Sequence, residues 1–205
     1  MNLAPASPVD ASVPLTVTFA GWNDPSAPLS YAVLVDGVVV SAQGASALRN
    51  IISPATPGAH TLKGRIYDAL NNVTEVTRLF TVSTALESWR QFHFGTTADS
   101  GDAANAFDYD QDGLVNLVEF AFGLLPKSGA SLQVPVAHIL DGNFVIRFTQ
   151  PSAVSGIAYG AEWCPDLIVA DWQPVEDSGG GGVHTFSVPI GTNFQMFMRL
   201  KVTVP

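Results

Sequence analysis

The feature that most constrains this chain is a run of twelve residues, Asp108–Glu119, in which acidic side chains recur at alternate positions ahead of a glycine. Aspartates stand at positions one, three and five of the run, and an asparagine and a glutamate follow at positions nine and twelve. Like charges this close together repel one another unless a cation offsets them. The spacing therefore predicts a metal-binding loop.

Calcium is the cation that this set of oxygens suits, because it is a hard ion that takes six to eight oxygen ligands at flexible geometry. We expect one oxygen from each aspartate, the main-chain carbonyl of position seven, the asparagine either directly or through a water, and both oxygens of the glutamate. Gly113 at position six allows the sharp turn. The predicted Ca²⁺ ligands are Asp108, Asp110, Asp112, Leu114, Asn116 and Glu119.

Two other interpretations of the run are weaker. An acidic, solvated start of a helix would explain aspartates before a helix, but not Gly113 or Glu119. Magnesium demands a stricter octahedral shell, so a pliable, oxygen-rich loop favours calcium. Calcium sensors usually pair two such loops, and this sequence has one. We therefore expect the ion to clamp the structure rather than to signal.

The residues around the loop predict a helix on each side. Thr84 and Glu87 have the spacing of a capping box, and Leu86, Trp89 and Phe92 then recur at helical spacing until Gly95. After the loop a second helix is expected to end at Pro126. Its predicted apolar face comprises Leu114, Leu117, Val118, Ala121 and Leu124.

Both ends of the chain have the pattern of short antiparallel strands. Asp36-Gly37 and Asn71-Asn72 lie between β-branched runs and predict hairpins, and Asp141-Gly142 does the same nearer the C-terminus. The later strands are expected at 143–149, 156–163, 183–188 and 194–204. The predicted fold is mainly β: two small antiparallel β-sandwiches joined by a helix–calcium loop–helix segment. We divide the chain into 1–83, 84–127 and 128–205.

Composition excludes several classes of function. A net charge of −9 argues against binding to nucleic acid or to an anionic membrane, and no apolar run is long enough to cross a bilayer. Seven of the eighteen acidic residues fall between Glu87 and Glu119, where Arg90 is the one lysine or arginine. The single cysteine, Cys164, excludes an internal disulfide and a cysteine-based zinc cluster.

The sequence shows no motif of an enzyme. Gly-x-Ser-x-Gly, His-Glu-x-x-His and Gly-x-Gly-x-x-Gly are all absent, and the four histidines are scattered. Asp99 and Asp102 lie in a small polar linker and are expected to be solvated. We therefore expect this chain not to be an enzyme. Trp22, Trp163 and Trp172 are candidates for stacking on sugars, although core packing is the favoured interpretation.

The segments that surround the loop carry a family resemblance. The sequences Trp89-Arg90-Gln91-Phe92 and Phe94-Gly95-Thr96-Thr97, with the loop and its Glu119–Leu124 exit, resemble an EF-hand-like or dockerin-like calcium module of bacterial secreted and surface proteins. Dockerins carry two loops, so cohesin binding is not implied. The segment 57–72 resembles immunoglobulin-like and PKD-like surface modules, and 159–172 resembles the β domain that often accompanies the calcium module.

The resemblance implies a location and a role. It suggests a calcium-stabilised structural, adhesion or anchoring region of an exported bacterial multidomain protein, extracellular or at the cell surface, with immunoglobulin-like or fibronectin type III-like sandwiches. The expected partners are neighbouring domains of a longer chain, a surface protein or a glycan. The N-terminal residues lack the pattern of a signal peptide, so we expect a piece of something longer. The alternative is a carbohydrate-binding accessory module of a secreted polysaccharide-degrading enzyme.

Overall fold

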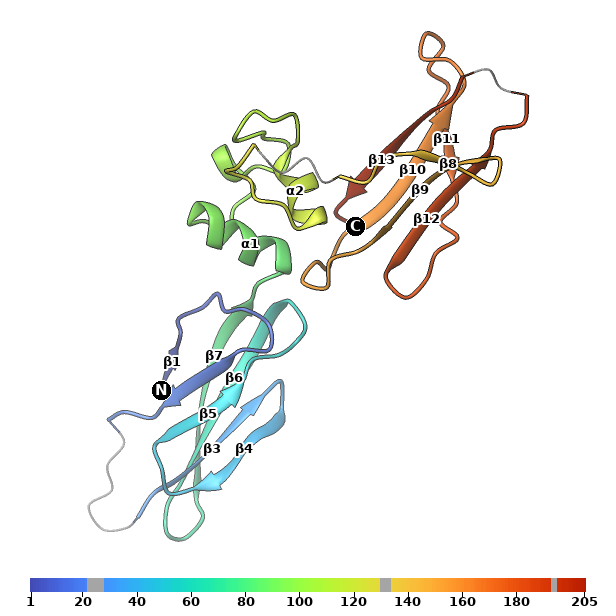
Figure 1. The fold of residues 1–205 in the computed structure, drawn as a ribbon. Coiled ribbons are helices and arrows are strands. Elements are labelled where there is room, and N and C mark those ends of the chain that lie inside the picture. Colours follow the sequence, from blue (N-terminus) through green and yellow to red (C-terminus); the bar gives the residue numbers. More distant parts are fainter. Residues whose placement is uncertain (22–27, 130–133, 193–194) are drawn as a thin grey trace. The chain divides into compact units, whose positions relative to one another are not determined.

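The computed structural model describes residues 1–21, 28–129, 134–192 and 195–205 (Figure 1). The chain divides into two compact units, Met1–Ser88 and Trp89–Pro205, each of which is described by itself. The fold is mainly β, as predicted. The boundary between the units falls inside helix α1 (Ala85–Phe94), whereas the division into three segments is finer and stays a prediction.

The first unit consists of two antiparallel sheets (Figure 1). The three-stranded sheet has the order β1-β2-β5, with β1 at Asn2–Ala4, β2 at Pro14–Thr18 and β5 at Leu48–Ile52. The four-stranded sheet has the order β4-β3-β6-β7, with β3 at Ser30–Val35, β4 at Val38–Gly44, β6 at Gly58–Tyr67 and β7 at Val73–Val82.

Alternate residues of both sheets build one hydrophobic core in this unit. Val17 of β2, Val33 of β3 and Leu62 of β6 are completely buried in it. Strand β6 buries every second residue because successive side chains point to opposite faces of a sheet. A Cβ at Gly64 would overlap the ring of Phe19, so the core has room there only for glycine.

The predicted hairpins are confirmed, and their backbone shows why these residues are there. Asp36 and Gly37 join β3 to β4 with φ values of 50° and 84°, the left-handed conformation that a two-residue hairpin requires. Asn71, with φ of 61°, lies in the turn from β6 to β7. Asp141 and Gly142, with φ values of 48° and 74°, join β8 to β9. Asp, Asn and Gly adopt this conformation most readily.

The second unit contains two three-stranded antiparallel sheets, of order β11-β10-β13 and β12-β9-β8. The strands are β8 (His138–Leu140), β9 (Asn143–Thr149), β10 (Ala158–Cys164), β11 (Gln173–Val175), β12 (Val183–Pro189) and β13 (Phe197–Thr203). Buried side chains come from both sheets, among them Ile146, Ala161, Cys164 and Phe186. Phe194, where the last strand was predicted to start, lies outside the described residues, as does Trp22.

Helix α1 begins with the predicted capping box. The amide N–H of Thr84 donates to Glu87 Oε2 at 2.7 Å, and the amide N–H of Glu87 donates to Thr84 Oγ1 at 3.1 Å. Phe92, which recurs at helical spacing with Leu86 and Trp89, is not buried: it is 83% exposed, and the buried residue of that turn is Arg90. Leu86 and Arg90 are four residues apart, so burial follows the i, i+4 spacing.

A short 3₁₀ helix, η1 (Gly101–Ala103), precedes the acidic loop, and α2 (Asn116–Phe122) follows it. Helix α2 is shorter than predicted. It ends at Gly123, in the left-handed conformation, rather than at Pro126. The ring of Trp89 on α1 lies 5.7 Å from the ring of Phe120 on α2, so the two helices are in contact. No helix of the described residues is long and apolar enough to cross a membrane.

Candidate metal centre

The three loop aspartates converge. One carboxylate oxygen from each of Asp108, Asp110 and Asp112 lies within 4.8 Å of the others. Each carboxylate also accepts a hydrogen bond from an amide of the loop itself, which fixes its orientation. These bonds are Gly113 N to Asp108 Oδ2 (3.0 Å), Asp112 N to Asp110 Oδ1 (3.3 Å) and Leu114 N to Asp112 Oδ1 (2.9 Å).

The second oxygen of each aspartate behaves differently from the first. Asp108 Oδ1, Asp110 Oδ2 and Asp112 Oδ2 are buried and accept no hydrogen bond from any residue that the structure describes. Buried polar atoms in folded proteins are nearly always hydrogen-bonded. Three unpaired carboxylate oxygens side by side therefore call for a positive partner.

Glu119, in the first turn of α2, lies close enough to the three aspartates for their negative charges to act on its carboxylate. Its side chain is completely buried, and neither Oε1 nor Oε2 has a hydrogen-bond partner among the described residues. Burial, and then the negative charges of Asp110, Asp112 and Asp108, raise the pKa of Glu119 to about 7. A carboxylate with both oxygens free is the group that binds calcium through two oxygens at the end of such a loop.

Asn116 contributes the sixth unpaired oxygen. The side chain is 1% exposed, and its Nδ2 donates to the carbonyl oxygens of Asp102 (2.9 Å) and Ala104 (2.8 Å). Its Oδ1 is buried and accepts no hydrogen bond from the described residues. The amide is therefore oriented with its nitrogen on the linker and its oxygen free.

These residues fit a hard divalent cation. Six side-chain oxygens from five of the six predicted ligands are buried without a partner among the described residues, and no nitrogen or sulfur ligand is in the cluster. A set made only of carboxylate and amide oxygens suits calcium better than zinc or copper. The roles of these five residues as calcium ligands, and that of Leu114 through its main-chain carbonyl, stay predictions.

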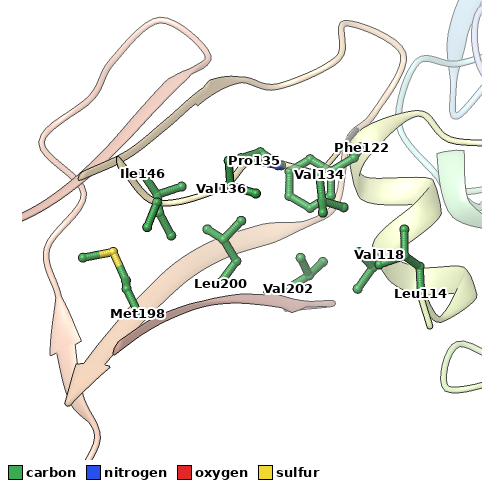
Figure 2. Close-up of a pocket in the computed structure, with 11 residues that line it drawn as sticks. Leu114, Val118, Phe122, Val134, Pro135, Val136, Ile146, Met198, Leu200 and Val202 are labelled. Atoms are coloured by element: carbon green, nitrogen blue, oxygen red, sulfur yellow. The ribbon is translucent and has the colours of Figure 1, made fainter. Parts of the chain in front are cut away.

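The side chain of Leu114 points into an apolar cavity of about 340 Å³ (Figure 2). Val118 and Phe122 of α2 line it from the helix side, and Met198 and Leu200 of β13 line it from the sheet side. The hydroxyl of Tyr159 on β10 also donates to the carbonyl of Ala121 on α2. The loop residues and α2 are therefore attached directly to the sheets of the second unit.

The sequence did not predict the part that the linker plays beside the loop. Asp99 and Asp102 are exposed, as expected, but they also take part in the structure of the linker: Asp99 Oδ1 accepts the amide of Asn105 at 2.7 Å, and the carbonyl of Asp102 accepts Nδ2 of Asn116. Arg90, buried, donates to Asn105 Oδ1 at 2.7 Å. The one signal in the sequence was that Arg90 is the only lysine or arginine among the acids of this stretch.

Aromatic side chains gather at the outer surface of the loop. Phe107 and Tyr109 are 41% and 38% exposed, and Lys127 Nζ lies 5.0 Å from the ring centre of Phe94 and 5.2 Å from that of Tyr109. Their rings are not coplanar, because those of Phe94 and Tyr109 are inclined by 58° and those of Phe107 and Tyr109 by 66°.

No family model matches this chain, and no curated protein matches it. Among solved structures, a chain from a study of the promiscuous specificity of carbohydrate-binding modules of the β-sandwich superfamily is 14% identical. That match covers 99% of this chain and 94% of the other, with a TM-score of 0.37. CopC from Methylosinus trichosporium OB3b is 21% identical over 40% of this chain and 90% of its own, with a TM-score of 0.27. Both likenesses are too distant to bear on function.

Proposed function

We propose that the loop Asp108–Glu119 binds one calcium ion, and that the ion stabilises the unit formed by residues 89–205. The observation that carries this proposal is the set of six buried side-chain oxygens without a partner among the described residues. Four carboxylates and one amide supply them, and a divalent cation would offset the repulsion among the carboxylates. In this proposal the segment from α1 to α2 is an EF-hand-like module in a chain of immunoglobulin-like sandwiches.

A structural role for the ion is favoured over a signalling one. The side chain of Leu114 lies in the same cavity as Met198 and Leu200 of β13, so fixing the loop also fixes the packing of α2 on a sheet. At free calcium about a hundredfold above Kd, ligand binding stabilises the folded state by about 2.7 kcal/mol. Calcium-binding modules that work outside the cell commonly have a Kd on the order of 10⁻⁴–10⁻³ M.

We infer further that the chain is a structural, adhesion or anchoring region of an exported bacterial multidomain protein, without catalytic activity of its own. Two histidine–aspartate pairs, His60–Asp36 and His184–Asp177, have Nδ1–Oδ2 distances of 2.6 Å. His60 is buried and its Nε2 contacts the carbonyl of Thr56. The Nε2 of His184 faces Gln150 Oε1 at 3.5 Å. Both pairs fit a structural role.

The test is isothermal titration calorimetry and thermal unfolding with calcium, magnesium and EDTA. The wild-type chain should bind calcium with a measurable heat, bind magnesium more weakly, and melt at a lower temperature in EDTA. Asp112→Ala should abolish the calcium response, whereas Asp171→Ala, which removes an exposed aspartate of the same unit, should leave it unchanged. If EDTA leaves wild-type melting unchanged and no heat of binding appears, the proposal is wrong.

Carbohydrate binding is the second candidate function. The observation in its favour is the aromatic cluster beside the loop, in which Phe107 and Tyr109 are exposed and Phe94 is half-buried, since sugars stack on aromatic faces. The inclination of the rings suits a bent or short glycan rather than a flat polysaccharide surface. A glycan array tests this function: signal that is lost in Tyr109→Ala and kept in Leu70→Ala, an exposed apolar residue of the first unit, would support it. An array without signal at saturating calcium would refute carbohydrate binding, and the structural role would be the one that remains.

A further inference from the structure

We propose that Arg90 and the linker 99–105 support the calcium site. They position Asn116 so that its Oδ1 binds the ion directly rather than through a water. The inference rests on the proposed calcium loop and concerns how position nine of that loop is used.

The orientation of the Asn116 amide is determined by its surroundings. An amide NH₂ group has two donor hydrogens, and the Nδ2 of Asn116 is within hydrogen-bond distance of two carbonyl oxygens, those of Asp102 and Ala104. A flipped amide would place Oδ1 against the same two oxygens, which are acceptors only. The carbonyl end of the side chain must therefore face the other way, toward the loop, where Oδ1 is buried and unpaired among the described residues.

The two carbonyls that hold Asn116 are themselves fixed. They belong to η1 and the residue after it, where the amide of Ala104 donates to Gly101 at 3.1 Å. The next residue, Asn105, accepts the amide of Leu117 at 3.1 Å through its carbonyl, and the amide of Asn116 donates to the carbonyl of Phe107 at 2.8 Å. The linker and Phe107 thus bind the first residues of α2 through main-chain carbonyls, which accept both backbone amides and the side-chain amide of Asn116.

Arg90 anchors the linker from α1. Its side chain is almost completely buried, and its guanidinium donates to Asn105 Oδ1 at 2.7 Å and to the carbonyl of Thr97 at 3.3 Å. It also lies 3.5 Å from Asp99 Oδ2, whose other oxygen accepts the amide of Asn105. A planar guanidinium can hold several acceptors in a fixed arrangement, which a lysine cannot do. Arg90 is therefore a positioning residue, acting on Asn116 through Asn105 and the linker.

The contacts of Asn116 predict that an aspartate at this position has the opposite effect from the one it has in an ordinary acidic loop. In a loop whose position nine is solvated, replacing asparagine by aspartate adds a negative charge and should strengthen calcium binding. Here one aspartate oxygen would face the carbonyls of Asp102 and Ala104 at the present nitrogen positions, 2.9 and 2.8 Å away. The repulsion would move the side chain out of place, so Asn116→Asp should weaken binding although it adds a ligand charge.

The experiment uses the full chain, with Tb³⁺ as a luminescent substitute for calcium. Lifetimes in H₂O and D₂O count the waters bound to the metal, and calcium affinity is measured by calorimetry. We expect Asn116→Ala to add one bound water and Asn116→Asp to raise the calcium Kd at least about tenfold. Gln111→Asp adds the same charge to an exposed loop position with φ of 62°, which aspartate tolerates, and should not raise the Kd. Arg90→Lys should raise the Kd about tenfold while Tb³⁺ still binds.

The outcomes separate this inference from the calcium site itself. If Asn116→Asp binds calcium as tightly as Gln111→Asp, or Asn116→Ala leaves the number of bound waters unchanged, the direct role of Asn116 is refuted and the calcium site stands. If Arg90→Lys changes neither affinity nor water count, Arg90 is not a positioning residue. If wild type binds neither Ca²⁺ nor Tb³⁺, the proposed function fails, and this inference with it.

Discussion

The aspartates of the turns and those of the acidic loop differ in how their carboxylate oxygens are hydrogen-bonded. In the turns, Asp36, Asp68 and Asp177 use both carboxylate oxygens: Oδ1 accepts backbone amides and Oδ2 bonds a side chain. In the loop, each aspartate uses one oxygen for a backbone amide and leaves the other buried and unpaired within the described structure. The contrast within one protein indicates that the unpaired oxygens are not a general property of its aspartates.

Replacement of Glu119 by glutamine should have effects of opposite sign with and without calcium. In EDTA, Glu119→Gln removes a buried carboxylate that lies close to three others and should stabilise the fold by about 1–3 kcal/mol. At free calcium about a hundredfold above the wild-type Kd, the variant should lose up to about 2.7 kcal/mol relative to wild type, because it binds the ion poorly. Urea unfolding in the two buffers measures both values. A variant less stable than wild type in both buffers would contradict a site built around cation binding.

The pair His60–Asp36 should make the stability of the first unit depend on pH. The hydrogen bond that His60 donates to the Asp36 carboxylate raises the pKa of His60 above its ordinary 6.5 and lowers the pKa of Asp36 below its ordinary 3.8. A raised histidine pKa adds stability that is complete below pH 6.5 and is lost as pH rises through the folded value. A lowered aspartate pKa adds stability that is lost as pH falls through its own folded value. The pair should therefore stabilise most at mildly acidic pH.

Asp36→Asn isolates this effect, since asparagine also accepts the positive φ of 50° at this turn. NMR titration of the His60 ring should show its pKa above 6.5 in wild type and lower in the variant. The free energy of unfolding of the first unit, measured by denaturation, should fall from pH 5.5 to 8.5 in wild type and should fall less in the variant. An identical pKa in both proteins would refute the contribution of Asp36.

At the scale of elements, the end of α2 is set by one glycine. Gly123 has φ of 68°, and its amide donates to the carbonyls of Glu119 and Phe120. Gly123→Ala should destabilise the second unit by about 1–2 kcal/mol, because a Cβ disfavours the left-handed conformation. Gly123→Asn should cost clearly less, because asparagine enters that conformation more readily. Thermal unfolding at saturating calcium compares the two, and equal losses would show that packing against Pro151, not the backbone, decides the effect.

Elements whose signal is local were predictable from the sequence. The hairpin turns follow from residues that adopt positive φ, and the start of α1 follows from two side chains three residues apart. Short strands such as β1, β5, β8 and β11 were not predicted, because three to five residues carry little pattern and depend on the neighbouring strand for their hydrogen bonds. The burial of Arg90 in place of Phe92 likewise depends on the linker that folds onto α1.

The candidate site likewise has a part with a local sequence signal and a part that depends on contacts between distant segments. Its candidate ligands could be named from the sequence because a loop of this kind lies within one continuous stretch, where residue types at fixed positions form the pattern. The support for Asn116 was not, since it comes from main-chain carbonyls of Asp102 and Ala104, which any residue type would supply. The part that these carbonyls play could be recognised only once their contact with Asn116 of α2 was known.

At the scale of the whole molecule, the predicted ligands all belong to the unit 89–205, so calcium should act there first. Hydrogen exchange in calcium and in EDTA measures this residue by residue. We expect exchange to slow by up to about a hundredfold from the linker through α2, with a smaller gain in β13, whose residues share the cavity of Leu114. Strand β6 of the first unit is the internal reference and should change little. Asp112→Ala should remove every calcium-dependent difference, and protection gained equally in β6 and α2 would show that the ion stabilises the chain as one body.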